Sequence, residues 1–290
     1  KRRVAFFSGG VDSFFTVLKL EKQANKGQNY PLTDLMLVWG FDIPLSNKSD
    51  FEALYERLQT AAKRLDKNLI SIITNMRETR FSESSWGYQS HGAALTSVVH
   101  ILENYFDAAY LGSGHSYYDL VEPWGSHPLV DNLFSSTSTK VILHGSPYRR
   151  VDKTEFIAHS EMVLEGLHVC WQDASDKNCG RCNKCYRTMI TLMILDTLKD
   201  CSTFHKNFLK LKDIEGLYSE NSSDIELIEE IADFAFKKQQ PEIAKAVLKS
   251  IRVSQRVNRA LPVVNFMRNQ WPLRRLGVCL HGLMFKGLIC

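Results

Sequence analysis

Short apolar runs recur along the chain as far as residue 144, and polar stretches separate them. Runs of about four to eight apolar residues are typical of strands that are covered on both faces of a sheet. The pattern therefore predicts five strands, at residues 4–7, 34–41, 69–73, 108–112 and 141–144.

Segments with apolar residues at helical spacing lie between these runs. In the clearest one, Phe51, Leu54 and Leu58 share one face of a helix that begins after the capping residues 49–50. The other predicted helices span roughly residues 14–24, 91–106 and 153–165. Strands that alternate with helices predict a doubly wound α/β fold, a parallel sheet with helices on both faces. Ligands in that class bind at the carboxyl ends of the strands, so residues directly after strands are candidate site residues.

After about residue 186 the pattern is helical to the end of the chain, with the clearest helices at 186–198 and 223–238. The second of these has acids near its start and lysines at its end, which the helix dipole favours. We therefore expect two domains, an α/β domain at residues 1–199 and a helical region at residues 200–290.

Composition narrows the class of protein only a little. The 290 residues are 44% hydrophobic and 23% charged, which is enough for a substantial core. No stretch approaches 18 uncharged apolar residues and no signal peptide precedes the first strand, so we expect a cytoplasmic protein with no membrane partner. The formal net charge of +4 is too small to imply a nucleic-acid partner by itself.

A glycine pair follows the first predicted strand, in the run Ser8-Gly9-Gly10-Val11-Asp12-Ser13. Adjacent glycines allow a tight turn that brings backbone N–H groups against an anion, and the next helix aims its positive end at the same place. The two serines add hydroxyl donors, and Asp12 can hold Mg²⁺ against phosphates. The run therefore predicts a phosphate-binding loop, without the lysine and spacing of the Walker type. An ordinary strand–turn–helix with a glycine hinge is the alternative, but it needs neither the aspartate nor the serines.

Lys153 opens the helix after the fifth predicted strand, in the sequence Lys-Thr-Glu and behind two arginines. A lysine in the first turn of a helix meets an unfavourable dipole unless an anion offsets it. Lys153 is therefore a candidate phosphate ligand, and the two arginines are weaker candidates. The alternative is an exposed capping turn, with Asp152 at the N-cap and Glu155 at the third helical position.

Four of the seven cysteines lie close together, at Cys170, Cys179, Cys182 and Cys185. The spacing C-x8-C-x2-C-x2-C lets four thiolates turn inward on one ion, and four sulfurs in a closed tetrahedron select zinc. Such a site leaves no open coordination position, so we expect it to be structural and to fix the loop before the helix at 186–198. A disulfide or an iron–sulfur cluster is the alternative.

The glycine run resembles the S-G-G-x-D-S signature of the PP-loop ATP pyrophosphatases, which split ATP between its α and β phosphates and adenylate an acceptor oxygen. Together with the Lys-Thr-Glu step and the four cysteines, it resembles the 7-cyano-7-deazaguanine synthase family over about residues 3–190. The resemblance implies an adenine nucleotide alpha hydrolase-like fold with ATP and Mg²⁺ at residues 8–13, Lys153 on the phosphates and Zn²⁺ at the cysteines. It also implies that ammonia attacks the adenylate of a carboxylate or amide oxygen, giving an amide or a nitrile.

The chain departs from this family where the acceptor would bind. An Arg-Asn pair of the family is replaced by Ser-His-Gly at 90–92, and an aspartate-tyrosine-serine-glycine run is replaced by residues 113–119. We therefore expect another acid as the substrate. Ser113, His115 and His91 are candidate substrate contacts, since they lie near the predicted mouth of the sheet and histidines supply proton-transfer groups.

The leading hypothesis is an ATP-dependent ligase that forms AMP and pyrophosphate, with a small-molecule acid and ammonia as partners and a homodimer left open. One alternative is a tRNA-modifying thiolase or ligase of the PP-loop class. A non-catalytic nucleotide-binding module is the other. No cysteine outside the zinc set has the neighbourhood of a nucleophile, which weighs against the thiolase.

The last 40 residues hold seven Lys or Arg residues and no Asp or Glu. Arg252, Arg256 and Arg259 share one helical face, which could meet the phosphates of a nucleic acid or an acidic partner. The sequence favours the alternative, a solvated face balanced by acids at 213–230, so a nucleic-acid partner stays open but is not favoured.

Overall fold

The computed structural model describes residues 2–121, 123–173, 175–220, 222–270, 274–286 and 288, without the side chains of residues 222, 223 and 274. The chain forms two compact units. The first contains residues 1–179 and 200–205, and the second contains residues 180–199 and 206–290. The chain thus passes from one unit to the other at three places, whereas the sequence pattern suggests a single boundary after residue 199.

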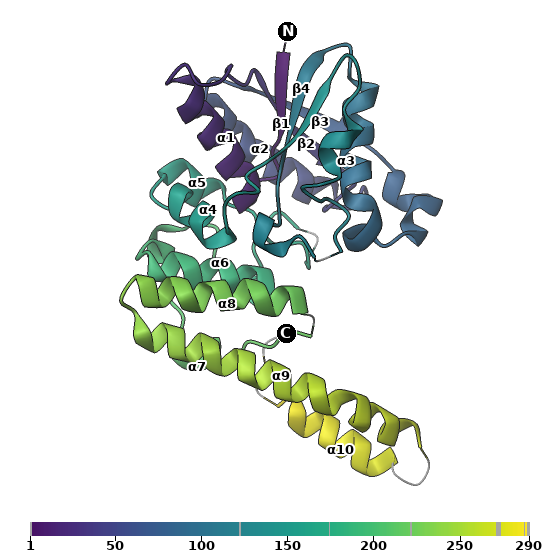
Figure 1. Ribbon diagram of the computed structural model, residues 1–290, viewed down its shortest axis with the longest axis vertical. Helices are drawn as coiled ribbons and strands as arrows, with labels where there is room; N and C mark the ends of the chain where they lie inside the picture. Colours follow the sequence, from purple (N-terminus) through teal and green to yellow (C-terminus); the bar gives the residue numbers. More distant parts are fainter. Residues whose placement is uncertain are drawn as a thin grey trace. The chain divides into compact units, whose positions relative to one another are not determined.

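A five-stranded, all-parallel sheet forms the centre of the first unit (Figure 1). Its strand order is β3-β2-β1-β4-β5. The strands are β1 (Arg2–Phe6), β2 (Asp34–Trp39), β3 (Asn68–Ile73), β4 (Phe106–Gly112) and β5 (Lys140–His144). Each strand overlaps one of the five apolar runs, so the predicted α/β class and its parallel sheet are confirmed.

Helices connect these strands and follow the last one. They are α1 (Val11–Ala24), α2 (Lys48–Arg64), α3 (His91–Ile101), α4 (Arg150–Ile157) and α5 (Glu161–Gly166). The prediction of one helix at 153–165 is wrong, because Ser160 has an extended backbone and serves as the N-cap of α5. The helix predicted at 91–106 ends at Ile101, and Phe106 already begins β4.

Apolar packing fixes the end of β1, from which the glycine loop leaves. Val4 and Phe6 belong to a buried cluster that also contains Val98 of α3. Phe7, the next residue along, packs against Phe14 of α1 with ring centroids 4.8 Å apart. The loop therefore starts from a strand that two helices hold in place.

Asp34 ties the amino ends of three neighbouring strands together. Its buried carboxylate accepts hydrogen bonds from Arg2 Nε at 2.8 Å, Thr33 Oγ1 at 2.6 Å and Asn68 Nδ2 at 3.2 Å. Burial acts to raise the pKa of Asp34, but the hydrogen bonds outweigh it and hold the pKa below its ordinary value. The strands are thereby held in register at the edge opposite the glycine loop.

The second unit is helical. Its elements are α6 (Asn183–Ile194), α7 (Leu211–Glu215), α8 (Ser222–Lys237), α9 (Pro241–Asn269) and α10 (Arg274–Met284). The helices predicted at 186–198 and 223–238 correspond to α6 and α8. Figure 1 shows α10 folding back along the end of α9, and a Cβ on Gly277 would lie 2.5 Å from the backbone nitrogen of Arg268. Only glycine permits so close an approach of the two helices.

The helices of the described ranges are either too short or too polar to span a membrane.

Candidate functional site

The loop between β1 and α1 has the tight geometry that its glycines predict. Gly9 has a φ of +80°, and a Cβ there would lie 2.9 Å from the side chain of Leu58. The Gly9 carbonyl accepts a hydrogen bond from the backbone N–H of His168 at 2.8 Å. Gly10 is the N-cap of α1 and has no side chain with which to cap the helix. The first-turn N–H groups of α1 therefore keep their capacity to bind an anion.

Asp12, in the first turn of α1, faces two cations from α4. Its Oδ2 accepts a hydrogen bond from Arg150 Nη1 at 2.5 Å, and its Oδ1 accepts one from Lys153 Nζ at 3.3 Å. Lys153 Nζ also donates to the backbone carbonyl of Ser113, which directly follows β4. The predicted pair Asp12 and Lys153 thus meets, although 141 positions separate the two residues in the sequence.

Lys153 is a buried cation and not a surface lysine. Its exposed fraction is 1%. An ammonium group with so little access to water needs the carboxylate and the carbonyl that contact it. The alternative of an exposed capping turn is therefore wrong. The helix begins three residues earlier, at Arg150, and Asp152 accepts a hydrogen bond from the backbone N–H of Arg149 at 3.2 Å.

His144 lies at the end of β5, close to this cation. Its Nδ1 is 3.2 Å from Thr16 Oγ1. Burial, and after it the charges of Lys153 and Lys19, lower the pKa of His144 to about 4. The imidazole is therefore neutral at pH 7, and the positive charge of the site comes from the lysine and arginine side chains.

Two of the three candidate substrate residues follow β4. Ser113 presents its carbonyl to Lys153, and its hydroxyl donates a hydrogen bond to the carbonyl of His115. His115 is buried, and the centroid of its ring lies 5.2 Å from that of Trp124. Asp12, Arg150 and Lys153 are here called the Asp12 cluster. Ser113 contacts this cluster through Lys153, while the ring of His115 packs on Trp124.

His91 lies in a second segment, residues 86–92, which backbone hydrogen bonds join to Gly125 in the chain that follows Ser113 and His115. It is the first residue of α3, and its ring centroid lies 5.4 Å from that of Trp86. Gly125 connects the two segments, because its N–H donates to Gly87 at 2.6 Å and its carbonyl accepts from Gly92 at 2.7 Å. The structure thus brings together the segments that carry the candidates, although each histidine packs on a different tryptophan.

Arg150 is the site residue that the sequence pattern identified least well. Two arginines precede Lys153, and no local signal distinguishes them. In the structure Arg150 binds Asp12, whereas the guanidinium of Arg149 lies 4.4 Å from the ring centroid of Tyr118. The distinction depends on a partner 138 positions away in the sequence.

The four predicted metal ligands come together. The Sγ atoms of Cys170, Cys179, Cys182 and Cys185 all lie within 4.8 Å of one another. Sulfurs in a tetrahedron around zinc, with Zn–S bonds of about 2.3 Å, are separated by about 3.8 Å. A small contraction therefore brings them to ligand distance, and the set could hold a metal ion such as zinc.

Asn178 holds the chain beside the cysteine cluster. Its Oδ1 accepts hydrogen bonds from the backbone N–H groups of Val169 at 2.8 Å and Cys170 at 3.1 Å, and its Nδ2 donates to Leu167 at 2.9 Å. Asn178 is 1% exposed, so water does not compete for these bonds. The sequence pattern did not single out this residue, because an asparagine in a polar loop is common on the surface.

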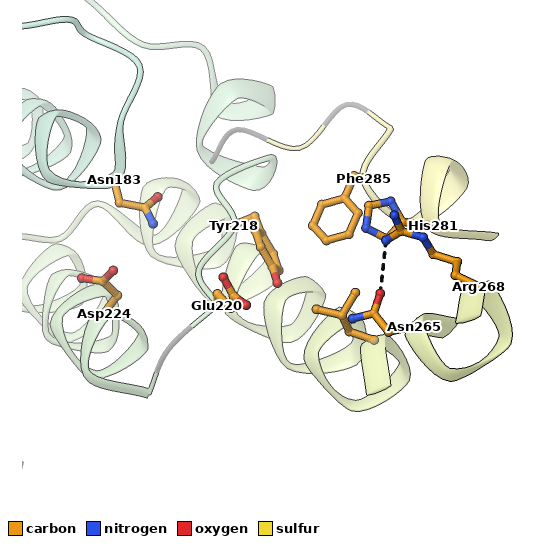
Figure 2. A pocket seen from close by; sticks show the side chains of 9 residues that line it. Asn183, Tyr218, Glu220, Asp224, Asn265, Arg268, His281 and Phe285 are labelled. Atoms are coloured by element: carbon orange, nitrogen blue, oxygen red, sulfur yellow. Dashed lines mark hydrogen bonds between the residues drawn. The ribbon is translucent and has the colours of Figure 1, made fainter. Parts of the chain in front are cut away.

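A polar hollow of about 490 Å³ lies within the second unit (Figure 2). Glu220 and Asp224 contribute carboxylates to its lining, Arg268 contributes a guanidinium and His281 an imidazole. Arg268 Nη1 donates a hydrogen bond to Asn265 Oδ1 at 3.3 Å. The lining contains none of the predicted site residues, and its mixed charges select neither an anion nor a cation.

Comparison of the chain with protein-family models, with curated proteins and with solved structures gave no match. What the site can do is therefore argued from its own residues.

Proposed function

We propose that the chain binds ATP with its phosphates on residues 8–13 and adenylates a small-molecule acid. The observation that supports this most directly is the convergence of Asp12, Arg150 and Lys153 beside the glycine loop. Two cations on one carboxylate leave a net positive charge, and it lies at the N-terminus of a helix. Both features favour the binding of a polyphosphate.

The position of the cluster in the sheet supports the same proposal, together with a doubly wound fold. The chain adds β2 and β3 on one side of β1, then β4 and β5 on the other. In doubly wound folds ligands bind where the strand order reverses, which here is between the carboxyl ends of β1 and β4. Asp12 follows β1 and Ser113 follows β4, and Lys153 makes hydrogen bonds to both.

The residues have separate roles in the proposed reaction. The N–H groups of the loop and of α1 hold the phosphates. Arg150 and Lys153 turn from Asp12 to phosphate oxygens. An acceptor oxygen attacks the α phosphorus, the bond from that phosphorus to the α–β bridging oxygen breaks, and pyrophosphate leaves, while Lys153 stabilises the charge that develops. Mg²⁺, when bound, offsets the charge of the phosphates. Asp12, which then no longer faces two cations, is the carboxylate that would hold the ion.

The acceptor in this proposal is a carboxylate oxygen, whose adenylate reacts with ammonia to give an amide and AMP. Where the acceptor is an amide oxygen, its adenylate loses a proton and AMP to give a nitrile. Ser113, His115 and His91 are proposed to contact the acceptor. Lys153 supports this for Ser113, whose carbonyl it contacts, and the hydrogen bonds of Gly125 to Gly87 and Gly92 hold the chain next to His91. We also propose that the cysteine cluster holds Zn²⁺ in a structural role, because four thiolates leave no position for a substrate.

The test is to incubate the full chain with ATP, Mg²⁺ and a panel of carboxylic acids, with and without ammonium, and to measure AMP, pyrophosphate and mass-shifted products. Asp12→Asn keeps the shape of the side chain and removes its charge, so it should abolish pyrophosphate release. The matched control is Arg64→Gln, at the end of α2, which breaks an exposed pair with Glu165 of α5 and should retain activity.

Three outcomes would count against the proposal. Equal activity of Asp12→Asn and the wild type would refute the role of Asp12. ATP binding without AMP formation for any acid would favour a non-catalytic nucleotide-binding module. Products that form only with tRNA and a sulfur donor would favour the thiolase.

A further inference from the structure

One face of α9 carries a row of arginines. Arg252, Arg256 and Arg259 are spaced by four and three residues, and all three are exposed. At 3.6 residues per turn they fall within about 60° of one another around the helix axis. Ser254 and Val257, on the opposite side of the helix, are buried. The three residues, here called the arginine row, therefore form the outer face of α9.

Two of the acids at 213–230 that could balance the arginine row pair with other residues instead. Glu215 pairs with Lys249 at 2.7 Å, and Asp224 pairs with Arg187 at 2.8 Å. Within the described ranges, no arginine of the row forms a salt bridge or a side-chain hydrogen bond. The three positive charges of the row thus have no carboxylate partner in the described part of the chain, and they can attract a polyanion.

Two exposed apolar side chains continue the same face. Val263 and Phe266 lie 11 and 14 positions after Arg252, within about 40° of it around the axis. Their exposed fractions are 55% and 61%. With a rise of about 1.5 Å per residue, Phe266 lies about 10 Å beyond Arg259 along the helix. The outer face of α9 thus has a charged part and an aromatic end.

We propose that this face binds single-stranded nucleic acid, with backbone phosphates on the arginine row and an unstacked base on Phe266. Sites for single strands combine positive charge along the backbone with aromatic rings on which bases stack. A duplex keeps its bases stacked and offers Phe266 no partner. A membrane-surface helix carries its apolar face alongside its cations, whereas here Val263 and Phe266 lie beyond them along the axis. The proposal is independent of the ATP site.

The test measures fluorescence anisotropy of a labelled single-stranded RNA of about 16 nucleotides, long enough for one such site, and of the matching duplex. The full chain is compared with Arg252→Gln/Arg256→Gln/Arg259→Gln at about 50 and 200 mM KCl. Each phosphate contact contributes about −0.7 to the salt slope for single strands. The triple variant should therefore lose a slope of about 2, so that raising the salt weakens the wild type about 20-fold more than the variant.

Two further sets of variants test whether binding depends on the arginine row and Phe266 or only on the total positive charge of the unit. Lys199→Gln/Lys212→Gln/Lys237→Gln removes three exposed lysines from the same unit and should leave binding and salt slope nearly unchanged. Phe266→Ala should weaken single-strand binding at least about five-fold, the lower limit for loss of one stacked base, without changing duplex binding. Phe266→Trp should restore it. Circular dichroism melting checks that every variant is folded.

Equal RNA affinity and salt slope in the wild type and the arginine variant would overturn the proposal, and so would an equal loss in the lysine control. Tighter binding to the duplex, with no effect of Phe266→Ala, would replace the single strand by duplex. Binding to vesicles of phosphatidylserine and phosphatidylcholine without binding to RNA would identify the face as a membrane contact and refute a nucleic-acid site.

Discussion

The pKa of His144 is lower in the folded protein than in the unfolded chain, and this difference makes the free energy of unfolding depend on pH. The unfolded chain protonates His144 near pH 6.5, whereas the folded protein does so only near the lowered pKa of about 4. Between these values the unfolded state binds more protons, so acidification lowers the free energy of unfolding, by at most about 1.4 kcal/mol per pH unit. Above about pH 6.5 the contribution is fully present. Urea denaturation at a series of pH values between about 7 and 5 measures the slope.

Two variants isolate this contribution. His144→Gln removes the titrating group, so the pH dependence should become flatter. His205→Gln removes an exposed histidine and should leave the dependence as it is in the wild type. An NMR titration in which His144 shows a pKa near 6.5 would contradict the prediction.

Gly112 and Gly114 differ in the space around them, although only one residue separates them. A Cβ on Gly112 would lie 2.8 Å from the carbonyl oxygen of Asp12, whereas one on Gly114 would meet nothing within 4 Å. Gly112→Ala should therefore push the first turn of α1 away and lower the free energy of unfolding by about 1–3 kcal/mol. Gly114→Ala is the matched control and should change it by less than about 0.5 kcal/mol. Equal denaturation curves for the two variants would contradict the prediction, because they would show that α1 can shift without a loss of stability.

At the residue scale, the sequence identified candidate residues where a reactive residue type occurs at a spacing typical of a binding motif. Asp12 lies two residues after a glycine pair, and the cysteines have a ligand spacing of their own. Arg150 was only a weaker candidate and Asn178 was not a candidate, since their roles depend on hydrogen-bond partners that only the folded chain supplies. No pattern within a few residues of either one encodes such a partner.

At the element scale, the cysteine loop gives the sharpest prediction. If the cluster holds zinc, Cys182→Ala should remove the metal and lower the melting temperature together, because metal binding by such a site contributes directly to folding free energy. Cys279→Ala, which changes an exposed cysteine outside the cluster, should alter neither quantity. Metal content by atomic absorption and melting by circular dichroism decide the matter. Complete metal loss with an unchanged melting curve would contradict a structural role.

Element boundaries were predicted less well than element types. The five strands were found because each contains a short, largely apolar run with polar residues around it. The break between α4 and α5 was missed, because apolar residues keep their helical spacing across Ser160. The sequence pattern gave no bounds for α9, whose interior contains Pro262, a residue type that usually ends a helix.

At the scale of the whole molecule, neither unit is a continuous segment of the chain. Residues 200–205 belong to the first unit, where Cys201 Sγ contacts the carbonyl of Leu164 at 3.4 Å. Residues 180–199 belong to the second, where Gln240 Nε2 donates to the carbonyl of Ile194 at 2.8 Å. A boundary placed after residue 199 cuts through this arrangement.

A chain that ends at residue 205 should therefore fold poorly. It keeps α6 but lacks α8 and α9, so Met189, Ile190 and Leu192, all buried in the full chain, lose the rest of their unit. We expect this shortened chain to aggregate, whereas residues 1–290 give a monodisperse protein by size-exclusion chromatography. A soluble, cooperatively melting chain of residues 1–205 would contradict the prediction.

The order of the two units along the chain also bears on how the protein is made. A ribosome releases α6 before α8, and at about 5–20 residues per second the end of α8 follows that of α6 after about 2–9 s. During this interval the apolar surface of α6 is not covered, because α8 has not yet been translated. Chaperones that bind apolar surfaces are thus expected to engage the nascent chain at this stage, and slower translation of the segment between α6 and α8 should lower the yield of folded protein.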